Sequence, residues 1–239
     1  MLISNKNCWI IANDRIKSEV NSRWFEDSYW LNQGRLLGAS SGRGSAWMVK
    51  SNHDKMMLRH YYRGGIPARF NKDKYLWTGL KNTRSFSEFH LLKKMIDLNL
   101  PVPAPIAAQA CKKGAFYQAN ILIKYLPHQW TFADLLNSNE DEIVNTWQNI
   151  GETIALFHNH GIYHADLNAN NILIDGSIIY LIDFDHSKHC QPRKRWQQAN
   201  LKRLKRSIDK LTESDYIGTN ELKWHSLLQA YQQKINTHV

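Results

Sequence analysis

The sequence contains few cysteines and no long hydrophobic run. Its three cysteines, at positions 8, 111 and 190, lie far apart and form no CxxC pair, so we expect neither a disulfide framework nor a thiolate zinc site, and a reducing compartment fits best. No stretch approaches the roughly 20 apolar residues of a membrane-spanning helix, and the first residues lack the basic and apolar regions of a secretory signal. We therefore expect a chain that neither spans a membrane nor is exported by that route.

Acidic residues are also scarce relative to basic ones. The chain has 31 Lys and Arg against 21 Asp and Glu, a net charge of +10, which favours an anionic partner: nucleic acid, an acidic membrane surface, or a phosphorylated or carboxylated substrate. Hydrophobic residues make up 43% of the chain, which excludes a disordered or fibrous protein. A length of 239 residues suits one large domain or two lobes that share a cleft.

Short strand-like runs dominate the first half. Residues 45–49 and 55–61 read as strands, and a basic, aromatic insertion follows at about 61–84. A helix is predicted from Ser85 to Pro101, with an apolar stripe at Phe86, Phe89, Leu92 and Ile96. The prolines of LPVPAP predict an extended connector, and AFYQANILIKYL reads as a strand pair that ends at Pro127.

Helices dominate the second half. Thr131 is a candidate N-cap, and residues 140–158 predict a long helix with an apolar stripe at Ile143, Trp147, Ile150, Ile154 and Phe157. The segment NILID-Gly176-IIYLIDF predicts a hairpin of two apolar strands. A basic amphipathic helix is predicted from Arg193. The pattern changes from strand-rich to helix-rich near Lys124 to Pro127, which suggests a hinge between two lobes. We therefore predict an N-terminal lobe, 1–126, and a C-terminal lobe, 127–239.

The segment HADLNANN places one carboxylate and two carboxamides between two apolar runs. His164, Asp166 and Asn171 fit H-x-D-x-x-x-x-N, and Asp183 follows at the end of the second hairpin strand. Phosphoryl transfer requires a carboxylate beside the acceptor hydroxyl and a divalent metal on the phosphates. We therefore assign Asp166 to the hydroxyl proton, and Asn171 and Asp183 to magnesium. The alternative interpretation is a polar loop followed by an Asp that caps a turn.

This arrangement resembles the protein-kinase-like fold. The resemblance implies an α+β, two-lobed chain with a β-rich N-terminal lobe and a small helical C-terminal lobe, which binds ATP and Mg²⁺. The segment from Gly42 and Gly44 to Val49 follows the glycine-rich loop pattern, with Trp47 in place of the third glycine, and its glycines allow backbone N–H groups to approach phosphates.

The resemblance also implies a cation on the next strand that contacts phosphate and pairs with a Glu on the following helix. Glu88 is the candidate acid, and Arg59 and Lys55 are both candidate cations. A solvated surface pair is the alternative interpretation.

Three residues depart from the protein-kinase pattern. Ala165 replaces the Arg that reads an activation-loop phosphate, so control by such phosphorylation is not expected. Asn168 stands where a Lys would neutralise the transferred phosphoryl group, which leaves that role to another basic group. Asp185 replaces the glycine after Asp-Phe and faces the metal or caps the turn. Because few residues follow Asp185 and no A-P-E is present, no protein substrate is expected.

A longer set of segments resembles the bacterial Kdo kinases, which belong with the lipopolysaccharide core heptose kinases. These segments, within residues 30 to about 211, are RHYYRGGIPARFNKDKYLWTGLKNTRSFSEF, LPVPAPIAA, HADLNANNILID, LIDFD and RWQQANLKRLKRS. The resemblance implies a sugar kinase that phosphorylates the 4-hydroxyl of the 3-deoxy-D-manno-octulosonic acid (Kdo) residue on a lipid A precursor, in lipopolysaccharide inner-core biosynthesis. It implies a peripheral enzyme at the cytoplasmic face of the inner membrane.

An acceptor that carries a carboxylate and phosphates suits the basic residues of the insertion. The candidate substrate contacts are Arg63, Arg69, Lys72, Lys74, Trp77 and Arg84. Tyr75, Trp77 and Trp30 are candidates for stacking on sugars or for the headgroup level of a bilayer. The basic helix from Arg193 either contacts anionic headgroups or packs on the second lobe with a solvated basic face. For each residue, ordinary packing or solvation is the alternative.

Several other functions fit part of the sequence. A heptose kinase of the same family and an aminoglycoside-type phosphotransferase share the catalytic loop, although the latter usually has a more acidic acceptor pocket. A non-catalytic kinase-like module or a basic nucleic-acid binder would not need Asp166, Asn171 and Asp183 together. No nucleic-acid motif is visible, so no nucleic-acid partner is expected.

Overall fold

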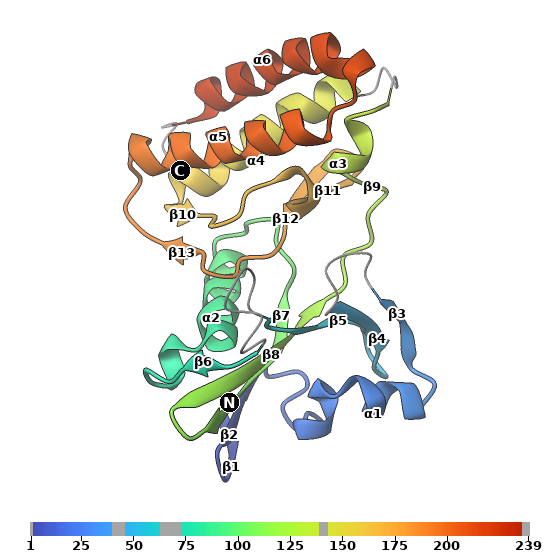
Figure 1. The fold of residues 1–239 in the computed structure, drawn as a ribbon, viewed down its shortest axis with the longest axis vertical. Coiled ribbons are helices and arrows are strands. Elements are labelled where there is room, and N and C mark those ends of the chain that lie inside the picture. The colour runs from blue at the N-terminus through green and yellow to red at the C-terminus, as the bar shows by residue number, and fades with distance from the viewer. Residues whose placement is uncertain (1, 40–45, 63–72, 139–142, 236–239) are drawn as a thin grey trace. The chain divides into compact units, whose positions relative to one another are not determined.

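The computed structural model of the chain divides into two compact units. It describes residues 2–39, 46–62, 73–138 and 143–235. Unit 1 comprises residues 1–93 and 103–126 and is rich in strands, whereas unit 2 comprises residues 94–102 and 127–239 and is rich in helices (Figure 1). The chain therefore passes between units at Lys93–Lys94, Val102–Pro103 and Leu126–Pro127, so residues 94–102, expected in the first lobe, belong to unit 2.

A single antiparallel sheet organises unit 1. Among the described residues it has eight strands, in the order β1-β2-β7-β8-β5-β4-β3, with β6 also paired to β8. The strands are β1 Leu2–Asn5, β2 Cys8–Ala12, β3 Leu36–Ala39, β4 Ala46–Lys50, β5 Lys55–His60, β6 Tyr75–Leu76, β7 Pro105–Lys113 and β8 Phe116–Lys124. The segment from Ala115 that was predicted as a strand pair is instead the single strand β8, and its partner β7 begins at Pro105, the last proline of the connector. The prediction missed β7 because prolines mask the start of a strand.

Side chains along β5 point alternately to two faces of the sheet, one packed in the hydrophobic core and one facing α2. Met56 and Leu58 are buried in a hydrophobic cluster with residues of the 3-10 helix η1 (Ser22–Phe25) and of α1 (Asp27–Asn32). Because successive strand residues point to opposite faces, Arg59 lies on the other face, where it reaches Glu88 of α2 (Arg84–Asp97). The sheet therefore directs the Arg59 side chain of β5 toward α2.

The helix predicted from Ser85 to Pro101 is α2, which runs from Arg84 to Asp97 and follows the 3-10 helix η3 (Leu80–Asn82). Phe86, Phe89 and Leu92 are buried, as the apolar stripe predicted. Ile96, however, is 40% exposed, and Met95 is fully buried in its place. The three- and four-residue intervals fit either residue, so the pattern alone did not define the last turn of the stripe.

A disulfide joins Cys8 and Cys111, which are direct cross-strand partners in β2 and β7. The expectation of a sequence without disulfides was therefore wrong. The two cysteines are 103 positions apart, and only the register of the strands brings them together.

Helices cover short strands in unit 2. Its helical elements are α3 Phe132–Leu135, α4 Ile143–Asn159, η4 Ala169–Asn171, α5 Lys194–Leu211, η5 Ser214–Tyr216 and α6 Ile217–Lys234, and its strands are β9 Trp130–Thr131, β10 Ile162–Tyr163, β11 Ile172–Asp175, β12 Ile178–Leu181 and β13 Lys188–His189. Thr131 caps α3 as predicted, with its hydroxyl accepting from the Asp134 N–H. Strands β11 and β12 form the predicted hairpin around Asp175-Gly176, where Gly176 has the positive φ that the turn requires.

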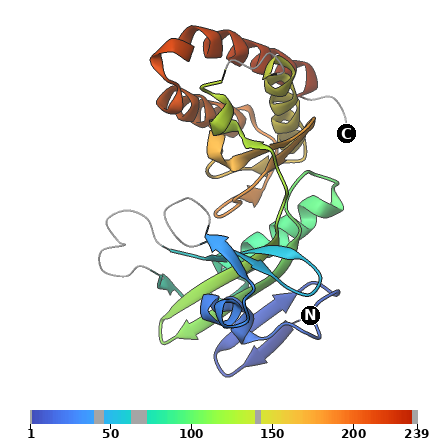
Figure 2. The ribbon, with the colours of Figure 1, turned by 90° about the vertical axis from the view of Figure 1, so that its right-hand side faces the viewer.

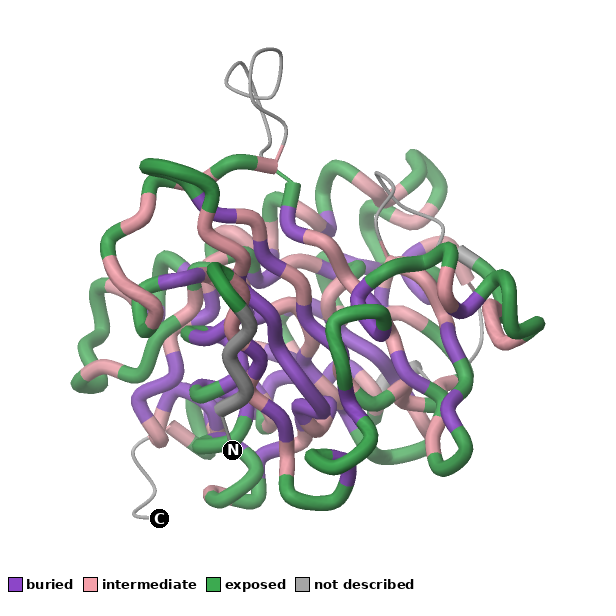
Figure 3. Tube along the Cα trace, turned by 90° about the horizontal axis from the view of Figure 1, so that it is seen from below, coloured by how far each residue is buried: buried purple, intermediate pink, exposed green. Residues whose placement is uncertain are grey.

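Helices α4 and α6 pack closely against each other (Figures 1 and 2). The α4 residues Trp147, Ile150, Ile154 and Phe157 are buried, as their spacing predicted. A Cβ on Gly151 would lie 2.2 Å from the carbonyl oxygen of Leu227 in α6, so only glycine permits this approach. Most buried residues belong to strands and helices, and the segments that connect them are largely exposed. Figure 3 shows this burial along the chain.

Candidate active site

The segment His164 to Asn171 lies between β10 and β11, and His164 anchors its start. The His164 ring is buried, its Nδ1 accepts the Asp166 N–H at 3.2 Å, and its Nε2 lies 3.0 Å from the carbonyl oxygen of Ile182. This pattern requires the neutral ring with the proton on Nε2. Burial also lowers the pKa of His164, although the Ile182 carbonyl opposes this effect. His164 therefore positions the loop and is not the proton acceptor.

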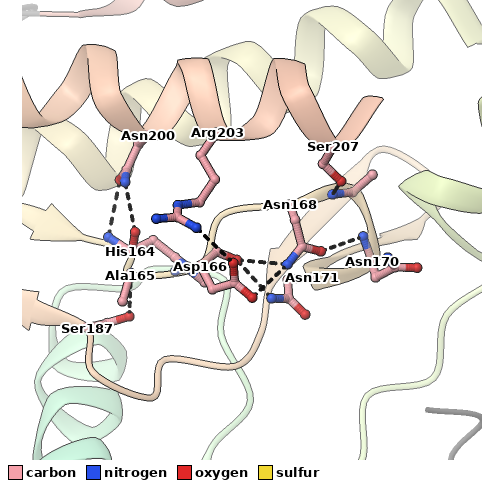
Figure 4. A network of polar contacts seen from close by, with 11 residues as sticks. His164, Ala165, Asp166, Asn168, Asn170, Asn171, Ser187, Asn200, Arg203 and Ser207 are labelled. Atoms are coloured by element: carbon pink, nitrogen blue, oxygen red, sulfur yellow. Dashed lines mark hydrogen bonds and ion pairs between the residues drawn. The ribbon is translucent and has the colours of Figure 1, made fainter. Parts of the chain in front are cut away.

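Asp166 has a fixed backbone and an exposed carboxylate. The Asn168 side chain donates to Asp166 Oδ2 at 3.0 Å, and both Asn168 and Asn171 donate to the Asp166 carbonyl oxygen, at 3.0 and 2.9 Å (Figure 4). The Asp166 side chain is 60% exposed, so a substrate hydroxyl can reach it. These contacts suit a general base that is held in place while it faces solvent.

Asn171 and Asp183 are linked through Ile182. The Ile182 N–H donates to the Asn171 carbonyl oxygen at 3.0 Å, and Ile182 directly precedes Asp183. Since the Asn171 Nδ2 is engaged by the Asp166 carbonyl, its Oδ1 is the atom suited to a metal. The Ile182–Asn171 hydrogen bond thus brings the two predicted metal ligands onto adjacent backbone.

Asp183 has an uncommon backbone conformation, with φ of +61°. Such conformations are costly for residues other than glycine and are enriched at functional sites. The next residue, Phe184, is buried, with its ring centroid 6.0 Å from that of Phe157 and 4.7 Å from that of His164. Packing of Phe184 therefore supports the strained residue beside it.

The donor set fits magnesium. Mg²⁺ prefers oxygen ligands and is commonly held by one or two protein side chains together with substrate phosphates and water. Asn171 and Asp183 offer this number and type of ligand. Among the described residues no cluster of three His, Cys, Asp or Glu side chains forms a protein-only metal cage, which such a site does not need.

Residues of α5 that the sequence interpretation did not assign hold the loop from one side. Asn200 accepts from the His164 N–H at 3.2 Å and donates to the His164 carbonyl at 2.8 Å, while Ser207 accepts from the Ala169 N–H at 3.1 Å. Both side chains point from the helix toward the loop (Figure 4). Their seven-residue spacing on one helical face is the sequence signal that could have revealed them.

His158, at the end of α4, extends this network and gives a pH prediction. Burial lowers the pKa of His158 from its ordinary value to about 4, although a hydrogen bond with Asn200 opposes this. Its ring contacts the Tyr231 hydroxyl at 2.9 Å and packs against Trp196. The unfolded chain therefore binds a proton between about pH 6.5 and pH 4 that the folded chain does not.

We expect stability to be highest above pH 6.5 and to fall by about 3 kcal/mol as pH falls to about 4, with His164 acting in the same direction. Urea unfolding across this range measures the effect. A His158→Gln variant should show a shallower slope, whereas exposed His225→Gln should match the parent. Equal slopes for all three proteins would contradict the role of His158.

In unit 1, Arg59 and Glu88 form the predicted ion pair. Their side chains are 17% and 2% exposed, and the Tyr61 hydroxyl donates to Glu88 Oε2 at 2.6 Å. The Arg59 guanidinium also lies 5.0 Å from the centroid of the Tyr61 ring. Burial, followed by the charge of Glu88, raises the pKa of Tyr61, so Tyr61 remains a donor. Lys55 is exposed at the start of β5. Gly42 and Gly44 lie outside the described residues.

The candidate substrate residues are only partly described. Arg63, Arg69 and Lys72 lie outside the described residues, and Lys74 is exposed. Trp77 stacks on Trp9 at 5.1 Å between ring centroids. The Arg84 guanidinium lies 4.7 Å from the Tyr75 ring centroid and donates to the Tyr75 hydroxyl.

Trp30 corrects a prediction. It is 1% exposed and its indole N–H donates to the Trp24 carbonyl at 2.8 Å, so it belongs to the core of unit 1 and does not stack on a sugar or lie at a membrane surface. Trp30 lies in a polar stretch of the sequence, which gave no indication that its side chain is buried.

Within the residues that the structure describes, no helix has the length and hydrophobicity needed to cross a bilayer.

A loop that presents an exposed Asp beside an Asn, followed by a strand hairpin and a second Asp, defines a phosphotransferase of the protein-kinase-like class. The family profile described as "Lipopolysaccharide kinase (Kdo/WaaP) family" matches residues 27–231. The chain therefore belongs to this family of kinases, and the predicted resemblance is confirmed.

Curated relatives cover nearly the whole chain. A 3-deoxy-D-manno-octulosonic acid kinase of Vibrio vulnificus (strain CMCP6) is 39% identical over 88% of this chain and 89% of its own length. A protein of the same name from Haemophilus influenzae (strain PittEE) is 37% identical over 95% of this chain and 97% of its own length. These relatives support a sugar kinase and give no support to the alternative functions considered above.

A solved structure described as "WaaP in complex with acyl carrier protein" resembles this chain with a TM-score of 0.61. The match covers 94% of this chain and 88% of that chain at 13% sequence identity, so it is a likeness of fold. The predicted protein-kinase-like α+β fold is thus confirmed.

Proposed function

We propose that this chain uses ATP and Mg²⁺ to phosphorylate the 4-hydroxyl of the Kdo residue on a lipid A precursor, in lipopolysaccharide inner-core biosynthesis. The observation that carries the proposal is the 37% identity to a 3-deoxy-D-manno-octulosonic acid kinase across 95% of the chain. The geometry of the loop that bears Asp166 supports the chemistry.

Asp166 accepts the proton of the acceptor hydroxyl as the oxygen of that hydroxyl attacks the γ-phosphorus of ATP. The new bond is sugar O–P, the bond that breaks joins the γ-phosphorus to the oxygen of ADP, and the electron pair of that bond leaves with ADP. Asn168 and Asn171 hold the backbone of Asp166, so the carboxylate is directed before the substrate arrives.

Asn171, through its Oδ1 atom, and Asp183 are the residues proposed to hold magnesium. When bound, the metal would supply positive charge that offsets the negative charge of the ATP phosphates. We favour Arg59 over Lys55 as the cation for the ATP phosphates because Arg59 is the one that pairs with Glu88. Gly42 and Gly44 remain the proposed glycine-rich loop.

The acceptor also implies a location. A lipid-linked acceptor calls for peripheral association with the cytoplasmic face of the inner membrane, and a net charge of +10 favours anionic headgroups. Helix α5 has exposed cations at Arg195, Lys202 and Arg206 that suit such contact, in addition to its buried face. Lys74, and the basic residues from Arg63 to Lys72, remain candidates for the acidic groups of the acceptor.

Mass spectrometry of a Kdo-bearing lipid A precursor, after incubation with enzyme, ATP and Mg²⁺, tests the proposal. We expect a gain of one phosphate, with fragmentation placing it on Kdo and NMR placing it on the 4-oxygen. An aminoglycoside serves as the control acceptor and should stay unmodified. Phosphate on the aminoglycoside alone, or on a heptose instead of Kdo, would overturn the assignment.

A further inference from the structure

Helix α5 presents three side chains to the catalytic loop from one face. Asn200 contacts His164, Arg203 contacts Asp166, and Ser207 contacts Ala169, so each is about one helical turn from the next (Figure 4). The outer two form hydrogen bonds with the loop backbone, which fix the position of the helix against it. Arg203, between them, is thereby held at the carboxylate of Asp166, with its Nη1 3.4 Å from Asp166 Oδ1.

The loop itself lacks the positive charge that phosphoryl transfer uses. Negative charge on the transferred group is spread over three oxygens, and protein cations aimed at those oxygens lower the barrier. Asn168, two positions after Asp166, is neutral, and its side chain is committed to Asp166 and to the Asn170 N–H at 2.9 Å. A cation must therefore reach this point from another element.

The basic residues near Arg203 on α5 either pair with other carboxylates or are exposed. Lys205 pairs with Asp209 at 2.6 Å and with Glu221 at 2.7 Å, and Lys202 and Arg206 are exposed. Arg203 is the α5 cation with a contact to the loop carboxylate, and its side chain is 43% exposed. An ion pair this long and this exposed contributes little to stability, so stability does not account for an arginine here.

We propose that Arg203 is a catalytic residue whose guanidinium contacts the transferred phosphoryl group. This inference rests on the role proposed for Asp166. As the sugar O–P bond forms and the P–O bond to ADP breaks, the hydroxyl proton passes to Asp166, while Arg203 keeps its own protons and donates hydrogen bonds to the peripheral phosphoryl oxygens. Its planar fork suits two such oxygens at once. It supplies from α5 the charge that Asn168 does not.

Steady-state kinetics of Arg203→Ala and Arg203→Lys test this role with ATP and the Kdo-bearing acceptor. We expect the Ala variant to lose about 10²–10³-fold in kcat, with KM values changed less than about threefold, and the Lys variant to retain more of kcat than Ala. Arg23→Ala, at an exposed arginine of η1 in unit 1, is the matched control and should keep the parental kcat.

A compensating variant separates charge from support of the loop. In Asn168→Lys/Arg203→Ala, a cation returns near Asp166 from the loop side, and we expect kcat to recover at least about tenfold over Arg203→Ala. Circular dichroism confirms that each protein is folded. Parental kcat in Arg203→Ala, or a loss that neither Lys variant relieves in folded protein, would overturn the inference.

Asp166→Asn in the same assay separates this inference from the function on which it rests. If Asp166→Asn keeps turnover, the proposed function of the loop fails. If Asp166→Asn loses turnover while Arg203→Ala keeps it, only the role of Arg203 fails.

Discussion

Replacing Asp166 by Asn is expected to abolish most phosphoryl transfer while leaving the protein folded and able to bind nucleotide. General-base catalysis typically contributes about 10²–10⁴-fold, so kcat should fall by about that factor. Asp166 accepts from Asn168 on Oδ2 at 3.0 Å and from Arg203 on Oδ1 at 3.4 Å. Asn retains one oxygen, which can accept from one of these two donors, but it cannot take up the hydroxyl proton at neutral pH. Initial rates at saturating ATP and acceptor measure the loss.

Asp166→Ala gives the matching test of position, because it removes the side-chain contacts as well as the base. We expect its kcat to be as low as that of Asp166→Asn, with the dissociation constant for ATP within about threefold of the parent. Asp215→Ala, at an exposed carboxylate in η5, is the control and should remain fully active. Turnover retained in Asp166→Asn but lost in Asp166→Ala would mean that Asp166 shapes the loop without accepting a proton.

Features that depend on local sequence were predicted well. The hairpin, the Thr131 cap and the buried stripe of α4 each follow from residues close in the chain, whose conformational preferences need no tertiary information. The order of His164, Asp166, Asn171 and Asp183 likewise indicated the kinase class, because this chemistry fixes residue types at short spacings.

Features that depend on how elements pack were missed. Strand register joins Cys8 to Cys111, and the docking of α5 brings Arg203 to Asp166 across 37 positions. In the sequence Arg203 is one of several basic residues of an amphipathic helix, and nothing local distinguishes it from Arg206. Trp30 shows the same limit, since its burial depends on Trp24 and the surrounding core.

The second large effect is expected at Glu88, whose removal leaves Arg59 without its buried carboxylate. Breaking a buried ion pair by deleting one partner typically costs about 3–5 kcal/mol, and Tyr61 also loses the acceptor of its 2.6 Å hydrogen bond. We therefore expect Glu88→Ala to lower the free energy of unfolding in urea by about this amount and to impair phosphoryl transfer. Glu152→Ala, at an exposed site in α4, should change stability by less than about 0.5 kcal/mol.

A double replacement distinguishes the stability of this pair from its catalytic use. In Arg59→Met/Glu88→Leu both charges are replaced by apolar groups of similar size, which is often neutral or stabilising. The loss of unfolding free energy should therefore shrink to about 1–3 kcal/mol, the cost of the buried Tyr61 hydroxyl that still lacks its acceptor. If Arg59 contacts the ATP phosphates, this folded protein should still transfer phosphate poorly, whereas Lys55→Ala should remain active. Parental activity in the double variant, or a loss in Lys55→Ala equal to that in the double variant, would instead assign the phosphate contact to Lys55 or to another cation.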